Sequence, residues 1–371
     1  MALLHSICLA LERVSAYLCR RKEVTMSSDK HACDHDVVDL VDEAFGLLEE
    51  GDVDGAERVC QHALEHDQGN AEVLTLAGCI ACERGAFTEA LDRFEGAIQA
   101  DPNHIVALID TAEVHLEMLG DPEKCLATCE RALPITVDDP DSRLEVLAYK
   151  ALALMELDRD EEARSALQAT KGLEVGDPDA LERVGGIAVA LEAWDVAEGA
   201  LSAALRIDPD HADAHYGMGW VHLERGDMAE MRTHWLRTLE LDQAVPRPDW
   251  HLTTQEFDAV AEKALLELPE RARTLLRTVP IVVEDAPAAP EIEDGLDPRV
   301  LGLFCGAPLD EQSHMDPAPE EPNVIKLYQR NLEAACLSRD ELVSEIRMTL
   351  LHETAHYFGL EDDELEQIGL G

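Results

Sequence analysis

Hydrophobic and small residues follow a helical period along the first two thirds of the chain, and the whole pattern recurs about every 34 residues. In residues 71–104, small residues stand at positions 8, 20 and 27 of the unit, a large apolar residue at position 24 and proline at position 32: Gly78, Ala90, Ala97, Phe94 and Pro102. Small residues let two antiparallel helices approach closely, the large residue fills the groove between neighbours, and proline ends the second helix. The pattern therefore predicts a helical hairpin.

The same pattern fits further stretches, so the sequence predicts about six helical hairpins over residues 37–243. It fits 37–70 and 178–211 well, and it fits 105–141, 142–177 and 212–245 more loosely. The pattern resembles the tetratricopeptide repeat (TPR). This resemblance implies a solenoid with a concave groove that binds a protein or peptide partner, and it implies binding rather than chemistry.

The helical pattern ends after Asp242, where the segment QAVPRPDWHL carries two prolines. We place a domain boundary there. The chain is then expected to have three parts: an N-terminal extension over 1–36, the repeats over 37–243 and a second domain over 244–371.

The second domain is expected to be small and to contain both helices and strands. A helix is expected over about residues 254–268. Short apolar or β-branched runs predict strands at 281–283 (IVV), 300–305 (VLGLFC) and 324–328 (VIKLY). The predicted fold is thus multidomain, with an all-α repeat solenoid followed by a small α+β domain.

One helix of the second domain carries a candidate metal site. Ser338 and Glu341 form a capping-box signature, which starts a helix that runs to about Phe358. His352 and His356 lie four residues apart, so their imidazoles share one helical face. Two nitrogens placed in this way can bind a single Zn²⁺.

The residues around the histidine pair complete the chemistry. Glu353 follows the first histidine, where a carboxylate can take a proton from metal-bound water. Gly359 comes three residues after the second histidine and can adopt the positive φ that ends the helix and turns the chain back. Asp362 can then approach the same ion as a third ligand, with Asp363 and Glu364 as the alternatives.

The extended motif H-E-x-x-H-x-x-G-x-x-D resembles the metzincin arrangement with aspartate in place of the third histidine. Residues 254–371 are similar to the small bacterial zincin-like metallopeptidases, in which the same helix, strands and motif occur in the same order. The resemblance implies a minimal zincin fold and a zinc-dependent peptidase, with Asp362 beside the two histidines as ligands and Glu353 as the general base. The chain departs from the metzincins in having no methionine after the third ligand, since Met348 lies upstream.

Two further features are candidates for contacts with a substrate. The strand at 324–328 is a candidate to pair with an extended peptide. Tyr328 and Tyr357 are candidates for stabilising a tetrahedral oxyanion, with packing as the alternative role of each.

Charge and composition narrow the range of partners. The chain has 30 Lys and Arg residues against 78 Asp and Glu residues, a net charge of −48, which disfavours nucleic acid and anionic membranes as partners. The 46% hydrophobic content is too high for a disordered acidic chain, and the 4% aromatic content favours cores of Ala, Leu and Val. The ten cysteines stand singly or at helical spacing, so a reducing, cytoplasmic location is expected. Met26 is an alternative to Met1 as the start.

Other clusters of reactive side chains are expected to be incidental. His31, Cys33 and His35 alternate as metal ligands do, but they lie outside the repeats. Cys79 and Cys82 form a C-x-x-C inside a predicted helix, where cysteine serves as a small core residue.

Two alternatives to a peptidase with a recruiting solenoid stay open. In the first, the protein is a scaffold whose zincin-like domain binds metal poorly and does no catalysis. In the second, the solenoid inhibits the site in cis, and activity appears only after residues 1–243 are removed.

Overall fold

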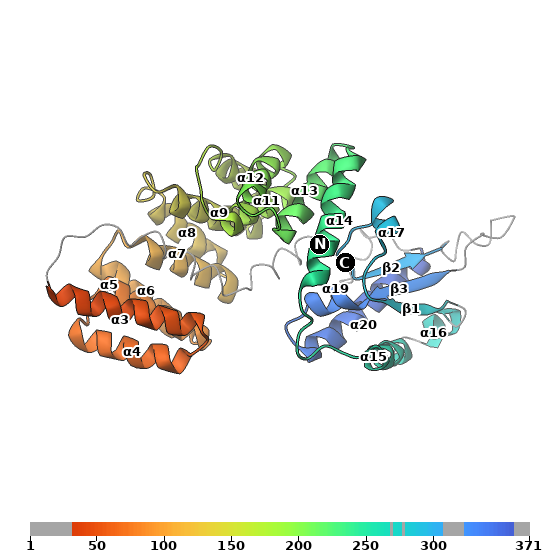
Figure 1. Ribbon diagram of the computed structural model, residues 1–371, viewed down its shortest axis with the longest axis horizontal. Helices are drawn as coiled ribbons and strands as arrows, with labels where there is room; N and C mark the ends of the chain where they lie inside the picture. Colours follow the sequence, from red (N-terminus) through yellow and green to blue (C-terminus); the bar gives the residue numbers. More distant parts are fainter. Residues whose placement is uncertain (1–31, 268–269, 277–278, 307–322, 360–371) are drawn as a thin grey trace. The chain divides into compact units, whose positions relative to one another are not determined.

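The computed structural model describes residues 32–267, 270–276, 279–306 and 323–359 (Figure 1). These residues form two compact units, one ending at Gly217 and the other beginning at Met218. None of the described helices is both long and apolar enough to cross a membrane.

The repeat region consists of helices that follow one another in the pairs that the repeat pattern predicts. They are α3 (Ala32–Glu49), α4 (Val53–His66), α5 (Ala71–Glu83), α6 (Phe87–Ala100), α7 (Ile105–Glu113), α8 (Pro122–Ala132), α9 (Pro140–Glu156), α10 (Asp160–Gln168), α11 (Pro178–Ala190) and α12 (Trp194–Ile207). A π-helical segment, η2 (Val114–Met118), continues α7. The last pair is α13 (Ala212–Glu224) and α14 (Met228–Ala244). The all-α architecture of the repeats is confirmed.

The two helices of a pair approach closely because a glycine at repeat position 8 faces the large residue at position 24. A Cβ added to Gly78 would collide with the ring of Phe94, and one added to Gly219 would collide with the ring of Trp235. Both residues are buried: Phe94 is 1% exposed and Trp235 is 0% exposed. The spacing seen in the sequence therefore reflects a direct contact within these two hairpins.

The second unit contains a three-stranded sheet with helices. Its elements after α14 are α15 (Thr254–Glu267), α16 (Glu270–Leu276), β1 (Ile281–Glu284), α17 (Ala289–Glu293), β2 (Gly302–Cys305), β3 (Val324–Tyr328), α19 (Gln329–Ala334) and α20 (Arg339–Tyr357). The predicted mixture of helices and strands is confirmed, as is the position of each predicted strand.

The order of the strands is β1-β3-β2, with β1 parallel to β3 and β2 antiparallel to it. The pairing of residues 324–328 with a substrate strand is therefore wrong. These residues form β3, the central strand, and both of its edges are already hydrogen-bonded to neighbours. An added strand needs a free edge, which a central strand lacks.

Helix α20 packs against the sheet through its apolar residues. Ile346 contributes to a core with Leu327 of β3 and Phe257 of α15, and all three are fully buried. Leu350, one helical turn further on, packs with Ile325 of β3 in a second cluster. This packing fixes the helix that carries the two histidines relative to the strands.

Charged side chains join α14 to the rest of the second unit. The guanidinium of Arg299 donates from Nε and one Nη to the two carboxylate oxygens of Asp242, at 2.8 and 2.9 Å. Arg232 of α14 donates to the backbone oxygen of Glu293 at the end of α17. The last repeat helix thus belongs by its contacts to the second unit, although its sequence follows the repeat pattern. The boundaries at 36/37 and 243/244 stay predictions.

Candidate metal centre

The capping signature predicted for the motif helix is present at the start of α20. The Ser338 side chain accepts a hydrogen bond from the N–H of Glu341 at 3.3 Å, and the Glu341 carboxylate reaches back to the N–H of Leu337 at 2.8 Å. At the other end, Gly359 has φ of 84° and its N–H donates to the oxygen of His356 at 2.9 Å. The helix therefore ends at a residue in the left-handed region, as the sequence predicts.

His352 and His356 lie together on one face of α20, and both are partly buried. Their Nε2 atoms are 2.8 Å apart, and their rings meet edge to face with centroids 4.5 Å apart. Two Zn–N bonds of about 2.0–2.1 Å at a tetrahedral angle separate the nitrogens by about 3.3 Å. A small rotation of either side chain brings the pair to this spacing. Imidazole nitrogens are ligands that Zn²⁺ commonly takes in proteins, so the two histidines fit this ion.

Glu353 is buried, with 6% of the residue exposed, and its carboxylate faces strand β2. Its Oε2 accepts a hydrogen bond from the N–H of Phe304 at 2.6 Å. That N–H is available because alternate residues of an antiparallel strand bond to the neighbouring strand. Leu301 pairs with β3 by accepting from the N–H of Tyr328, so the backbone groups of Phe304 point to the outer edge of β2.

Gly302 allows β2 to lie directly against α20. A Cβ at this position would come 2.6 Å from Cγ2 of Thr349 and 3.0 Å from Cγ of Glu353. Only glycine leaves enough space for that approach without a shift of the helix or strand. The strand run VLGLFC was visible in the sequence, but the roles of Gly302 and Phe304 depend on a contact with a helix about 50 residues away.

The predicted third ligand, Asp362, lies outside the described residues, and so do its alternatives Asp363 and Glu364. The structure therefore brings His352 and His356 together, places Glu353 on the same helix with its carboxylate on the Phe304 N–H, and leaves the third ligand as a prediction.

The two tyrosines proposed for the oxyanion are packing residues in this structure. Tyr328 is fully buried, and among the described residues its hydroxyl has no hydrogen-bond partner. Burial, with the charges of Glu291 and Glu284 adding to it, raises the pKa of Tyr328. Tyr357 is 3% exposed and packs edge-on against Phe304, with ring centroids 5.6 Å apart.

Of the two cysteines of the C-x-x-C, Cys79 is a core residue, as expected, and Cys82 is partly buried. Cys79 is buried and its thiol donates to the backbone oxygen of Thr75 at 3.0 Å. Burial, followed by the charge of Asp110, raises the pKa of Cys82 to about 12. Such a thiol carries almost no thiolate at neutral pH, so it is a poor nucleophile or metal ligand. His31 and the side chains of Cys33 and His35 are not among those that the structure describes.

Comparison with known families agrees with the sequence analysis for both the repeats and the second domain. Residues 276–371 match the model of the zincin-like metallopeptidase family. Residues 81–143 and 185–245 match models of the tetratricopeptide repeat. The chain carries tetratricopeptide repeats and a zincin-like metallopeptidase domain. The zincin-like domain spans the whole H-E-x-x-H-x-x-G-x-x-D motif, and the family implies zinc binding.

Several solved structures are similar to part of the chain. PilF of Pseudomonas aeruginosa is 15% identical over 62% of this chain and 99% of its own, with a TM-score of 0.48. PilW, a type IV pilus biogenesis factor, is 12% identical over 56% and 94%, with a TM-score of 0.47. YrrB, a TPR protein with an unusual peptide-binding site, is 17% identical over 50% and 93%, with a TM-score of 0.37. At these values we draw no functional conclusion from the similarity. A search of the curated proteins finds no match to the chain.

Proposed function

We propose that the protein is a zinc-dependent peptidase whose TPR region recruits a protein or peptide. His352, His356 and Asp362 would hold Zn²⁺, and Glu353 would be the general base. The observation that carries the proposal is the histidine pair on α20, whose Nε2 atoms lie 2.8 Å apart, on a helix where Glu353 is bonded to the outer edge of β2, inside a domain of the zincin-like family.

The bond from Phe304 gives Glu353 a fixed orientation. Zn²⁺ held by His352, His356 and Asp362 would supply a Lewis acid for hydrolysis of a peptide bond. The Phe304 N–H holds the carboxylate at Oε2, and we assign Oε1 as the atom that takes a proton and later delivers it to the leaving amine. Because Glu353 is buried, bulk water does not compete with the Phe304 N–H for its carboxylate.

The outer edge of β2 replaces residues 324–328 as the place where a substrate would pair. In this edge strand the backbone groups of Gly302 and Phe304 point away from β3. The Phe304 N–H is taken by Glu353, so a peptide would pair through the Gly302 N–H and C=O and the Phe304 C=O. An extended peptide added there would run alongside α20, which contacts the same edge through Glu353. Its scissile bond would then lie near the two histidines.

The TPR region would bring the substrate to this site. Repeats of this kind typically bind proteins or peptides. A chain with a net charge of −48 favours a basic partner. Binding in one domain raises the local concentration of substrate at the other.

Replacing Glu353 with glutamine tests the proposed mechanism. The glutamine side-chain oxygen can still accept from Phe304, but the amide cannot take a proton. In zinc-loaded full-length protein assayed on a mixture of quenched fluorescent peptides, Glu353→Gln should lower kcat/KM about 10²- to 10⁴-fold with the zinc content unchanged. Equal activity of the two proteins would refute the mechanism. Zinc-loaded wild type that cleaves nothing in the mixture would favour the scaffold.

The Glu353→Gln protein also offers a route to the substrate. It should retain a partner that wild type cleaves and releases. Mass spectrometry of proteins captured by Glu353→Gln but not by wild type would identify it.

A further inference from the structure

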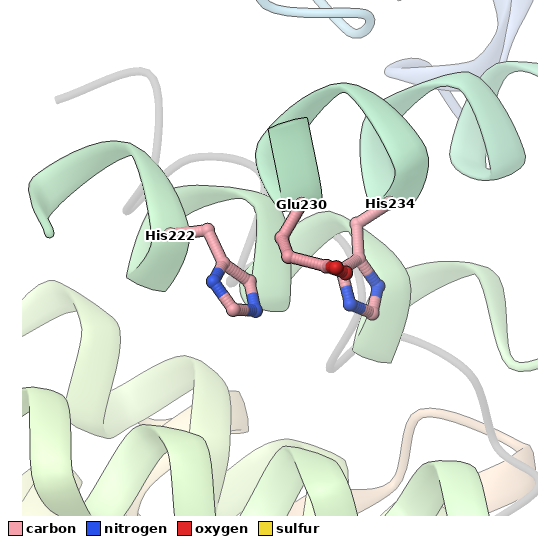
Figure 2. Close-up of side chains that lie close together, drawn as sticks. All are labelled: His222, Glu230 and His234. Carbon is pink, nitrogen blue, oxygen red and sulfur yellow. The ribbon is translucent and has the colours of Figure 1, made fainter. Parts of the chain in front are cut away.

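We infer that the last helical hairpin carries a second metal site, formed by His222, Glu230 and His234 and suited to a transition-metal ion such as Zn²⁺. Each residue offers one ligand atom, and these three atoms lie within 4.8 Å of one another. Figure 2 shows the three side chains projecting from neighbouring helices toward a common point. The site is separate from the zincin motif and does not depend on the proposed peptidase function.

The hairpin brings these residues together from two helices. Glu230 and His234 are four residues apart on α14, so they share one face of that helix. His222 lies near the end of α13, and Gly226, with φ of 73°, turns the chain between the helices. The N–H of Asp227 donates to the oxygen of His222 at 2.9 Å, which holds the turn close to the site.

A packed core beside the site fixes the register of the two helices. Trp235, the neighbour of His234 in sequence, is fully buried against Gly219 of α13. Its ring also meets that of Trp220 edge to face, with centroids 5.4 Å apart. The packing of the two helices therefore places the Cα atoms of His222 and His234 so that their side chains face each other.

Side-chain rotation alone can bring the three ligand atoms to the spacing that a bound ion requires. The rings of His222 and His234 are stacked, with centroids 5.4 Å apart and an interplanar angle of 14°. Tetrahedral zinc needs ligand atoms about 3.3–3.5 Å apart. Because the three ligand atoms lie within 4.8 Å of one another, rotation about the χ angles of the side chains has to change each separation by no more than about 1.5 Å, and Glu230 is exposed and free to turn in solvent.

The donor set defines the kind of ion. Two imidazole nitrogens and one carboxylate suit zinc and its neighbours in the first transition row, whereas Mg²⁺ and Ca²⁺ prefer sites made of oxygen alone. Because α14 is bonded to the zincin-like domain through Asp242 and Arg299, an ion that fixes α13 to α14 would stabilise the last hairpin on that domain.

Metal content per chain gives the first test. Full-length protein is stripped with a chelator, dialysed against Zn²⁺ alone and analysed for metal. We expect His222→Ala/His234→Ala to hold one zinc fewer per chain than wild type. His62→Ala/His66→Ala is the matched control, because that pair also brings two imidazoles together, with Nε2 atoms 3.2 Å apart, but belongs to no three-ligand cluster among the described residues. The control should keep the wild-type content.

A milder variant protects the test against misfolding. Glu230 is exposed, so Glu230→Gln should fold normally. It should lower the zinc affinity of this site about tenfold or more, because losing even a group that only hydrogen-bonds to a metal ligand costs about 10- to 100-fold in metal affinity. Free zinc at 100 times the dissociation constant should lower the unfolding equilibrium constant about 100-fold in wild type and less in this variant. A zinc content in His222→Ala/His234→Ala equal to wild type, or an unchanged affinity in Glu230→Gln, would overturn the inference.

The zincin motif can be separated from this site in the same experiment. His352→Ala/His356→Ala should lose a different ion, so its effect and that of His222→Ala/His234→Ala should add. If His352→Ala/His356→Ala keeps the wild-type zinc content while His222→Ala/His234→Ala loses one ion, the proposed peptidase site is wrong and the hairpin site stands. If His222→Ala/His234→Ala keeps the wild-type zinc content while His352→Ala/His356→Ala loses one ion, the hairpin site is wrong and the motif site stands.

Discussion

Substitution of Gly302 by alanine should loosen the contact between β2 and α20 on which the orientation of Glu353 depends. The new methyl group would lie 2.6 Å from Cγ2 of Thr349 and 3.2 Å from the backbone oxygen of Lys326. Excess volume in a packed core costs about 1–3 kcal/mol. Alanine restricts the unfolded chain more than glycine, which returns about 0.4–1 kcal/mol. The net loss should be about 0.5–2 kcal/mol in this region.

Hydrogen exchange of peptides that cover β2 and α20 measures this loss locally, without assuming that the whole chain unfolds in one step. A loss of about 0.5–2 kcal/mol corresponds to exchange about 2 to 30 times faster in these peptides. Activity should fall with it, because the Phe304 N–H moves relative to the Glu353 carboxylate.

Two further variants make the reasoning refutable. Thr349→Ser removes the Cγ2 atom in the collision and keeps the hydroxyl, so Gly302→Ala/Thr349→Ser should recover part of the lost protection. Gly199→Ala is the matched control, because a Cβ at Gly199 would meet nothing within 4 Å. If Gly302→Ala exchanges like wild type, or if the serine substitution recovers nothing, the close contact is not what holds β2 in place.

Three other predictions concern charges and thiols. Arg299→Lys cannot keep both bonds to Asp242 and should weaken the docking of α14 by about 1 kcal/mol, seen as faster hydrogen exchange in that helix. Burial lowers the pKa of His211, but its hydrogen bond and charge interaction with Asp179 outweigh this and raise it. Stability from this pair should be complete below the ordinary histidine pKa of about 6.5 and disappear as pH rises through the raised value, so the Tm difference between wild type and His211→Asn should shrink from pH 6 to pH 9. Cys82, with a pKa of about 12, should react with iodoacetamide at pH 8 about a hundredfold more slowly than free cysteine, measured by mass spectrometry.

The repeats could be predicted from the sequence because their decisive contacts are local. Gly78 and Phe94 belong to one hairpin and are 16 positions apart, so the spacing of small and large residues is itself a record of the packing. The same holds for the motif helix, where the histidine pair and the turn at Gly359 all lie within eight residues.

Contacts between distant segments could not be predicted in this way. Strand β3 follows β1 and β2 in the chain but lies between them, and its paired residues are 19 or more positions away in the sequence. The bond from Phe304 to Glu353 joins residues 49 positions apart. His222 and His234 form no short motif and meet only once the last hairpin is folded.

The central claim, that Zn²⁺ is held by the motif in the last helix, is tested most directly by metal analysis in the His222→Ala/His234→Ala background, where the hairpin site no longer contributes. We predict one zinc per chain in that background, retained in Glu353→Gln, lost in His356→Ala and strongly reduced in Asp362→Ala. A folded protein in that background with no bound zinc, or with zinc that survives both ligand substitutions, would contradict the account.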